Sequence, residues 1–160
     1  MKHISHYFCT ALLGTAVLTA CSGAEKVKSN TPVQITMWNY YNGAQKEEMD
    51  RLVQEFNDTV GLEQKIVVES VSKGSVSELE DAVRDSTDGK TGSDPLPDFC
   101  SAYADAAYDL WKKDKISDFR PYLTDEEYDS YISGYLEEGN FGTNAAMMIF
   151  PVAKSTEVLT

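Results

Sequence analysis

The chain has 160 residues, enough for one ordinary domain, and its composition is strongly acidic. It contains 26 aspartates and glutamates against 14 lysines and arginines, which gives a net charge of −12 at pH 7. A surface of this sign repels nucleic acid and bare anionic lipid, so both are poor partners.

The first 20 residues have the layout of a signal peptide. Lys2 supplies a positive charge, and residues 7–20 follow without any charge, a run that is too short to span a bilayer comfortably. The stretch Leu18-Thr19-Ala20-Cys21 resembles a lipobox, in which the cysteine thiol receives diacylglycerol. We therefore expect residues 1–20 to be a signal peptide that is removed before Cys21.

Lipidation of Cys21 would hold the protein on the extracytoplasmic face of the cell membrane, because two or three acyl chains anchor a protein stably. The Ser-Gly-Ala-Glu stretch after this cysteine is typical of a flexible tether. We therefore expect residues 21–32 to form a lipidated tether without a fold of its own.

Removal of the signal peptide would also restrict the chemistry of the folded part. Both histidines, His3 and His6, would leave with the signal, which excludes Ser–His, Cys–His and His–zinc chemistry. Cys9 would leave as well, and lipidation would use Cys21, so only Cys100 would remain and no intramolecular disulfide could form. We predict that Cys100 is an inert core cysteine and that the protein has no catalytic residue, metal site or cofactor.

From residue 33 onward, short β-rich runs alternate with helical patterns, which predicts an α/β fold with a mainly parallel sheet flanked by helices. Strands are predicted at residues 33–38, 65–71, 98–102 and 146–151. Helices are predicted at about residues 44–60, 75–85, 105–112 and 124–138. The connections include a loop rich in Gly, Pro, Asp and Ser at residues 87–97 and an extended link at residues 116–123.

Sequence signals support three of these helices. Ser75 with Glu78 and Thr124 with Glu127 have the spacing of capping boxes, which mark helix starts. The helix that begins near residue 44 has apolar residues on one face and Gly61 just past its end. These apolar residues are Met49, Leu52, Val53, Phe56 and Val60.

Aromatic and amide residues gather at residues 38–45 (WNYYNGAQ), where the first strand ends. Ligands of open α/β sheets bind at this carboxyl edge. Tyrosine rings can stack there on the apolar faces of a sugar, and amides can bond to its hydroxyls. We expect Trp38 in the core and at least one of Tyr40 and Tyr41 in a binding site. Three later tyrosines have helical spacing and predict a packing stripe instead: Tyr128, Tyr131 and Tyr135.

Several stretches of the sequence, in this order, match a known family. They are residues 35–41 (ITMWNYY), 54–57 (QEFN), 72–75 (SKGS), 96–98 (LPD), 102–105 (AYAD) and 150–159 (FPVAKSTEVL). Behind a lipobox, they resemble the extracellular solute-binding proteins of ABC transporters, in the group that contains the maltose and glycerol-3-phosphate receptors. The resemblance covers nearly the whole mature segment.

This resemblance implies a two-lobed protein that closes around a small solute, most often a carbohydrate, and delivers it to the transmembrane subunits of an ABC permease. It implies that residues 33–153 are the N-terminal lobe, a periplasmic-binding-protein-like lobe. Residues 154–160 would begin the hinge crossing into a second lobe that is missing from the sequence. Such a protein works by binding and closure and breaks no bond.

The resemblance also implies ligand contacts at the ends of the strands and at the hinge. These candidate residues are Tyr40, Tyr41, Asn42 and Gln45 after the first strand, Gly74 and Ser75 after the second, Tyr103 and Asp105 after the third, and Ser155 and Thr156 at the hinge.

Two alternatives remain open at this stage. The solute could be a phosphate ester, because the helix start at Gly74 and Ser75 offers backbone donors and Lys73 and Lys154 offer positive charge. The other alternative is a surface glycoside hydrolase that uses two carboxylates, although no acidic residue stands in a recognisable pair.

Overall fold

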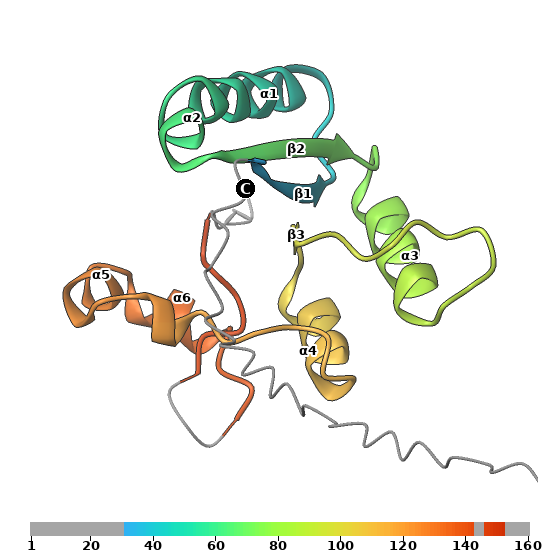
Figure 1. Cartoon of the computed structure of the whole chain (residues 1–160). Helices are drawn as coiled ribbons and strands as arrows, with labels where there is room; N and C mark the ends of the chain where they lie inside the picture. The colour runs from blue at the N-terminus through green and yellow to red at the C-terminus, as the bar shows by residue number, and fades with distance from the viewer. Residues whose placement is uncertain (1–30, 143–145, 153–160) are drawn as a thin grey trace, which may run out of the picture.

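A computed structural model of the chain describes residues 31–142 and 146–152 (Figure 1). Several sequence predictions lie outside these residues: the signal peptide, Cys21 and nearly all of the tether, and the hinge segment with Ser155 and Thr156. None of the described helices is long and apolar enough to cross a membrane.

The described elements alternate between strands and helices as the sequence predicts. The strands are β1 (Val33–Asn39), β2 (Ile66–Ser72) and β3 (Phe99–Cys100). The helices are α1 (Gly43–Asp58), α2 (Val60–Gln64), α3 (Val76–Thr87), α4 (Ala104–Lys112), the short 3-10 helix η1 (Arg120–Tyr122), α5 (Asp125–Asp129) and α6 (Ser133–Glu137).

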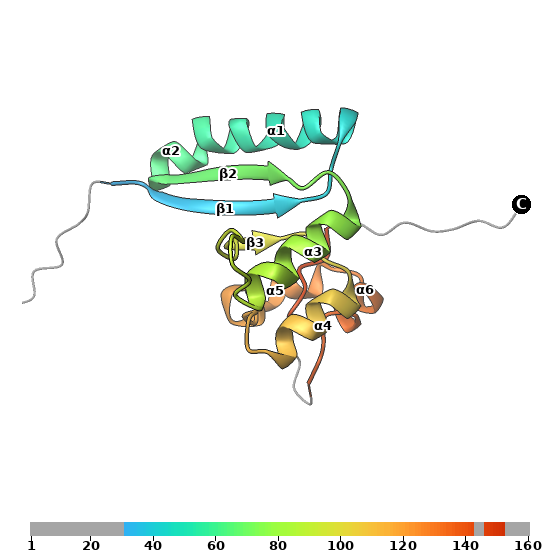
Figure 2. The ribbon, with the colours of Figure 1, turned by 90° about the vertical axis from the view of Figure 1, so that its right-hand side faces the viewer.

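The three strands form one parallel sheet in the order β2-β1-β3. β1 and β2 pair along their whole length, from Val33 beside Ile66 to Asn39 beside Ser72. Helices α1 and α2 lie on one side of this sheet, and α3 and α4 lie on the other (Figure 2). The predicted α/β fold, with a parallel sheet flanked by helices, is therefore confirmed.

The main hydrophobic core lies between the sheet and the helices α3 and α4. It consists of Trp38, Leu79, Val83 and Leu110, and Trp38 is only 3% exposed, as the sequence predicts. Burial of each such side chain stabilises the fold by roughly 1.5–3 kcal/mol. The other side of the sheet is less well covered, because α1 has no fully buried residue.

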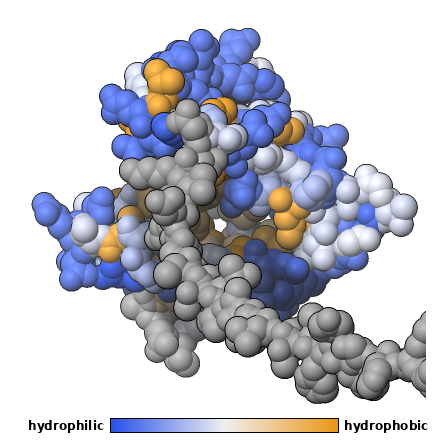
Figure 3. Space-filling model, viewed as in Figure 1, coloured by the Kyte–Doolittle hydropathy of each residue, from blue (hydrophilic) through white to orange (hydrophobic). Residues whose placement is uncertain are grey.

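Several large hydrophobic side chains lie outside this core and are exposed. The visible face is largely hydrophilic, with hydrophobic residues in small separate spots (Figure 3). Leu52 of α1 belongs to the predicted apolar stripe but is 48% exposed, whereas Val53 and Phe56 are half-buried. The stripe therefore packs against the sheet through only part of its residues.

The predicted helix at residues 44–60 is in fact two helices. The first ends at Asp58, and Thr59 leaves helical geometry with φ −120° and ψ −96° while its hydroxyl donates to the Glu55 carbonyl at 2.6 Å. Gly61 does not end a helix but lies buried inside α2. A Cβ at Gly61 would be 2.6 Å from the Ile66 carbonyl oxygen, so the absent side chain permits close packing of α2 on the start of β2.

The predicted helix at residues 124–138 is also broken. The Thr124–Glu127 capping box is confirmed, but α5 ends after Asp129 and α6 starts at Ser133. The Ser130 hydroxyl donates to the Glu127 carbonyl at 2.6 Å, and Ile132 takes an extended conformation with ψ 120°. Such local side-chain bonds compete with continued helix formation.

This break also separates the three tyrosines of the predicted packing stripe. Tyr131 packs edge-on against Phe150, with ring centroids 5.3 Å apart, and Tyr128 lies 4.5 Å from the Arg120 guanidinium. Tyr135 is 40% exposed. The prediction of a common stripe is therefore wrong.

The predicted strand at residues 146–151 does not form within the described residues 146–152. Met147 is buried, and its backbone N–H donates to an Asp118 carboxylate oxygen at 2.8 Å. Its carbonyl accepts from the Phe119 N–H at 2.9 Å, and the Met148 N–H donates to the Gly139 carbonyl at 2.9 Å. These backbone groups are satisfied by loops rather than by a neighbouring strand.

Two smaller differences concern the middle of the chain. The third strand is only two residues long, because the Asp98 side chain, rather than its backbone, accepts from the Thr36 N–H at 2.8 Å. The link predicted to be extended contains η1, where Pro121 stands in the first turn. Proline is compatible with the start of a helical turn because its φ angle is already close to the helical value.

Candidate ligand-binding site

The three parallel strands end at the same edge of the sheet (Figure 2). Three segments meet there: residues 39–42, which begin with the last residue of β1, residues 72–75, which begin with the last residue of β2, and residues 101–103 after β3. The Ser101 N–H donates to the Trp38 carbonyl at 2.9 Å, and the Lys73 N–H donates to the Asn39 carbonyl at 2.8 Å. The sheet ladder thus continues into these segments and fixes their positions.

Asn39 is the polar centre of this edge, with only 1% of its surface exposed. Its side-chain nitrogen donates to the Ser70 hydroxyl at 2.9 Å, and its side-chain oxygen accepts from the Tyr41 N–H at 3.0 Å. Sequence reasoning missed this residue, although a polar residue at the end of a buried strand is a usable signal. Asn39 joins β1 to β2 and fixes the backbone that carries the neighbouring tyrosines.

Tyr40, Tyr41 and Tyr103, here called the tyrosine cluster, lie together at this edge. The rings of Tyr40 and Tyr41 have centroids 5.1 Å apart at an angle of 57°. Tyr103 lies directly before α4, in the segment that follows β3, and its ring is nearly parallel to that of Tyr40, with centroids 6.4 Å apart and an angle of 10°. Tyr40 is half-buried and Tyr103 is 53% exposed, so the cluster has both support and an accessible surface.

The surroundings of Tyr40, the central tyrosine of the cluster, disfavour ionisation of its hydroxyl. Burial raises the pKa of Tyr40 above its ordinary value, and the nearby Tyr103 and Tyr41, with a hydrogen bond to Tyr103, raise it further. Like an ordinary tyrosine, Tyr40 is protonated at neutral pH, and its hydroxyl can both donate and accept a hydrogen bond.

Residues 72–75 are tied to the cluster by side-chain hydrogen bonds. The Ser72 hydroxyl donates to the Tyr41 carbonyl and accepts from the Gly74 N–H, the latter at 3.1 Å. The Asn42 amide donates to the Gly74 carbonyl at 3.0 Å. Gly74 has φ +91°, a value that favours glycine, so this position is restricted by backbone geometry.

The Lys73 ammonium, which the sequence offered for an anionic ligand, is already engaged. Its Nζ lies 3.7 Å from the centroid of the Trp38 ring and 3.2 Å from an Asp94 carboxylate oxygen. The side chain is 17% exposed. Lys73 therefore holds residues 88–98 against the end of β2 rather than presenting a free charge.

The start of α3 is occupied by its own carboxylate. The Ser75 hydroxyl accepts from the Glu78 N–H at 3.2 Å and donates to the Glu78 carboxylate at 2.7 Å, so one half of the predicted capping box forms. A Cβ at Gly74 would be 2.8 Å from the same carboxylate. A negative group already stands where a phosphate would bind, and this geometry argues against the phosphate-ester alternative at this helix.

Two other candidate residues, Gln45 and Asp105, stand in the first turns of helices. Gln45 is exposed in the first turn of α1, and Asp105 is exposed at the start of α4. The Asp105 carboxylate accepts from the Ala106 N–H at 2.9 Å. The structure thus brings together Tyr40, Tyr41, Asn42, Gly74, Ser75 and Tyr103 at one edge; their role as ligand contacts stays a prediction.

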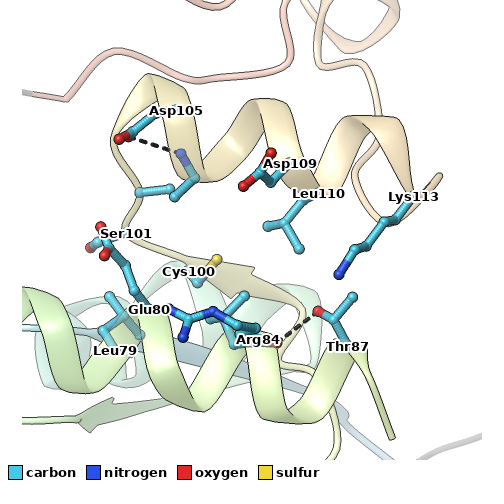
Figure 4. A pocket seen from close by; sticks show the side chains of 13 residues that line it. Leu79, Glu80, Arg84, Thr87, Cys100, Ser101, Asp105, Asp109, Leu110 and Lys113 are labelled. Atoms are coloured by element: carbon cyan, nitrogen blue, oxygen red, sulfur yellow. Dashed lines mark hydrogen bonds between the residues drawn. The ribbon is translucent and has the colours of Figure 1, made fainter.

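Asp105 lines a pocket of about 210 Å³ between α3 and α4, together with Ser101 and Ala102 of the segment after β3 (Figure 4). Leu79, Leu110 and the Cys100 thiol form apolar parts of its wall. Cys100 is half-buried and packs against the core rather than within it, and burial raises the pKa of its thiol, which disfavours the reactive thiolate. The remaining charged residues that line this pocket are Glu80, Arg84, Asp109 and Lys113.

Among residues 31–142 and 146–152, no group of three or more acidic, His or Cys side chains could hold a metal ion.

Comparison with known proteins gives a structural likeness only. No protein-family model matches the sequence, and no curated protein matches it. The maltotriose binding protein of Thermus thermophilus, solved with maltotriose, matches with a TM-score of 0.54 and 18% identity over 71% of this chain and 28% of that one. CpMnBP1, solved with mannotriose, matches with a TM-score of 0.51 and 18% identity over 68% of this chain and 26% of that one.

The fold is similar to part of these sugar-binding proteins. At this level of identity the likeness concerns the fold and carries no residue of the site. The chain spans about a quarter of the length of each neighbour, 28% and 26%. The activity and partners of the whole protein are therefore matters for proposal.

Proposed function

We propose that this chain forms the N-terminal lobe of a carbohydrate-binding lipoprotein that captures a sugar outside the cell and delivers it to an ABC permease. The protein acts by binding and releases its ligand unchanged. Both structural neighbours were solved with an oligosaccharide bound, maltotriose in one and mannotriose in the other, which favours a neutral oligosaccharide as the solute.

The tyrosine cluster is the observation that carries this proposal. An exposed ring surface, Tyr103, lies almost parallel to the half-buried Tyr40 at the ligand-binding edge of a parallel sheet. Tyrosine offers an apolar face for the C–H side of a sugar and a hydroxyl for hydrogen bonding. No charged side chain is needed for this mode of binding, which agrees with the engagement of Lys73 by Trp38 and Asp94.

Saturation-transfer NMR on the full-length chain in detergent tests this function, with maltotriose and mannotriose as ligands. A single lobe offers roughly half the contacts of a closed cleft, and half the binding free energy of a micromolar complex corresponds to a Kd of about 1 mM. We expect Tyr40→Ala and Tyr103→Ala each to weaken binding by about tenfold, which is the effect of a loss of about 1.4 kcal/mol.

Tyr122→Ala is the matched control, since Tyr122 is 82% exposed in η1 and lies outside the tyrosine cluster. This variant should bind both sugars as the unchanged chain does. Equal loss of binding in the control, or no transfer to either sugar at concentrations well above 1 mM, about the Kd expected for one lobe, would count against the proposal.

The membrane anchor and the absence of catalysis are separate parts of the proposal. Replacement of Cys21 by Ser should release the exported protein from the membrane fraction, because the thiol that receives the lipid is lost. Incubation with chromogenic glycosides should give no hydrolysis, whereas turnover that depends on two carboxylates would favour the glycoside hydrolase alternative.

A further inference from the structure

The strand β2 lies at one edge of the described sheet, since the order is β2-β1-β3. The Lys65 carbonyl accepts from the Val33 N–H, and the Lys73 N–H donates to the Asn39 carbonyl. Backbone groups alternate sides along a strand, so the odd-numbered residues of β2 face β1. The N–H and C=O groups of Val68, an even-numbered residue, therefore point away from β1, toward what we call the outer edge of β2.

An outer edge of this kind can pair with a strand of another molecule. The sequence of β2, IVVESVS, favours such intermolecular pairing, because it is rich in β-branched residues and its Val67 is 38% exposed. Free N–H and C=O groups along such a strand are a template for intermolecular sheet formation.

Asn57, near the end of α1, occupies this edge. Its side-chain oxygen accepts from the Val68 N–H at 2.8 Å, and its side-chain nitrogen donates to the Val68 carbonyl at 2.9 Å. One primary amide thus supplies the same pair of hydrogen bonds that a residue of a neighbouring strand would supply. Both bonds are partly buried, which shields them from competition by water.

The next outward carbonyl of β2 is covered by α2. Ile66 is even-numbered like Val68, and its carbonyl oxygen would lie 2.6 Å from a Cβ placed on Gly61. No additional strand can approach where a helix backbone already lies this close. The corner between α1 and α2 therefore covers two successive outward positions of β2.

We propose that Asn57 acts as a substitute strand residue that closes the outer edge of β2 to a second copy of this chain. The strand that would otherwise pair with this edge is β2 of another molecule, because two identical edges related by a two-fold axis can pair with each other. This inference does not depend on sugar binding, and its test needs no ligand.

Sedimentation of the full-length chain in detergent, over a range of protein concentrations, tests the proposal. Asn57→Ala removes both hydrogen bonds to Val68 and should lower the concentration at which dimers form by about tenfold. Gln54→Ala is the matched control, since Gln54 is an exposed amide on the same helix. It should sediment as the unchanged chain does.

A second substitution separates edge pairing from aggregation of unfolded chains. Val68→Pro, added to Asn57→Ala, removes the outward N–H but leaves the ladder with β1 intact, and proline is tolerated on strand edges. We expect the double variant to return to the sedimentation of the unchanged chain. Sedimentation of Asn57→Ala like that of the control, or association that persists with Val68→Pro, would overturn the proposal.

Discussion

Asn39, at the sheet edge that carries the candidate site, is both buried and polar. Such a residue is stable only because each of its side-chain groups has a partner, here Ser70 and the Tyr41 N–H. An apolar replacement leaves those partners buried without a hydrogen bond, which costs about 1–3 kcal/mol.

We therefore predict that Asn39→Ala lowers the free energy of unfolding by about 1–3 kcal/mol. Urea denaturation followed by circular dichroism measures this change. Gln45→Ala, at an exposed position in α1, is the control and should change the stability by less than about 0.5 kcal/mol. Equal effects of the two substitutions would show that the Asn39 hydrogen bonds contribute nothing.

Tyr40 makes the stability sensitive to high pH. Its pKa is raised in the folded state, chiefly by burial, whereas in the unfolded chain it is about 10. As the pH rises, Tyr40 therefore loses its proton first in the unfolded state. The contribution of the protonated Tyr40 to the free energy of unfolding is fully present below about pH 10 and is lost as the pH rises through the pKa of the folded state.

A titration of Tyr40 by NMR, with ¹³C-labelled tyrosine rings, checks this prediction. Tyr40→Phe assigns the signal, and the same variant should lose less stability than the unchanged chain between pH 9 and pH 11, about one unit on either side of the unfolded pKa. An ordinary tyrosine pKa for this signal would contradict the burial of the Tyr40 hydroxyl in the folded state.

Glu78 should keep anions away from the start of α3. Glu78→Gln removes the negative charge beside Gly74 and Ser75, so inorganic phosphate should shift the backbone amide signals of residues 75–77 more than in the unchanged chain. Glu80→Gln makes the same change in charge on the same helix and should have no such effect. Phosphate binding by the unchanged chain would reopen the phosphate-ester alternative.

At the scale of the elements, local patterns predicted β1, β2 and α3 to within two residues. Their signals are contained in consecutive residues: alternation or apolar runs for the strands, and Ser75 with Glu78 for the helix. The breaks within residues 44–60 and 124–138 were not predicted, and neither was the loop structure of residues 146–152. Met147, for example, bonds to Asp118, which is 29 residues away.

In the candidate site, too, some features could be predicted from the sequence, and others depend on contacts between residues that are distant in the chain. The sheet-edge rule and the family resemblance placed Tyr40 and Tyr103 at one edge, and the structure brings their rings together. The engagement of Lys73 was beyond prediction, because it depends on where Asp94 and Trp38 lie after folding. Asp105 was assigned to the site by the family resemblance, and in the structure it lines the pocket between α3 and α4, a placement that depends on the packing of these two helices.

Gly61 gives a direct test of the packing between α2 and β2. We predict that Gly61→Ala lowers the free energy of unfolding by about 1–3 kcal/mol, since the new methyl group would be 2.6 Å from the Ile66 carbonyl oxygen. Gly134→Ala is the control, because a Cβ there has no atom within 4 Å. Thermal denaturation of both variants measures the difference, and equal melting temperatures would contradict the close approach.

At the scale of the whole molecule, net charge and local geometry favour the same class of ligand. The chain carries a formal charge of −12, and the one lysine of residues 72–75 is engaged by Trp38 and Asp94. A neutral sugar that stacks on tyrosine feels little of this charge, whereas an acidic sugar is repelled at long range. Sugar affinity should therefore change little with salt concentration.

The central claim is that a sugar binds on the tyrosine cluster, and ring NMR of the full-length chain during a maltotriose titration tests it most directly. The signals of Tyr40 and Tyr103, assigned with Tyr→Phe variants, should shift together along one binding curve while the signal of the exposed Tyr122 stays in place. Saturable binding of maltotriose that leaves Tyr40 and Tyr103 unchanged would contradict the account.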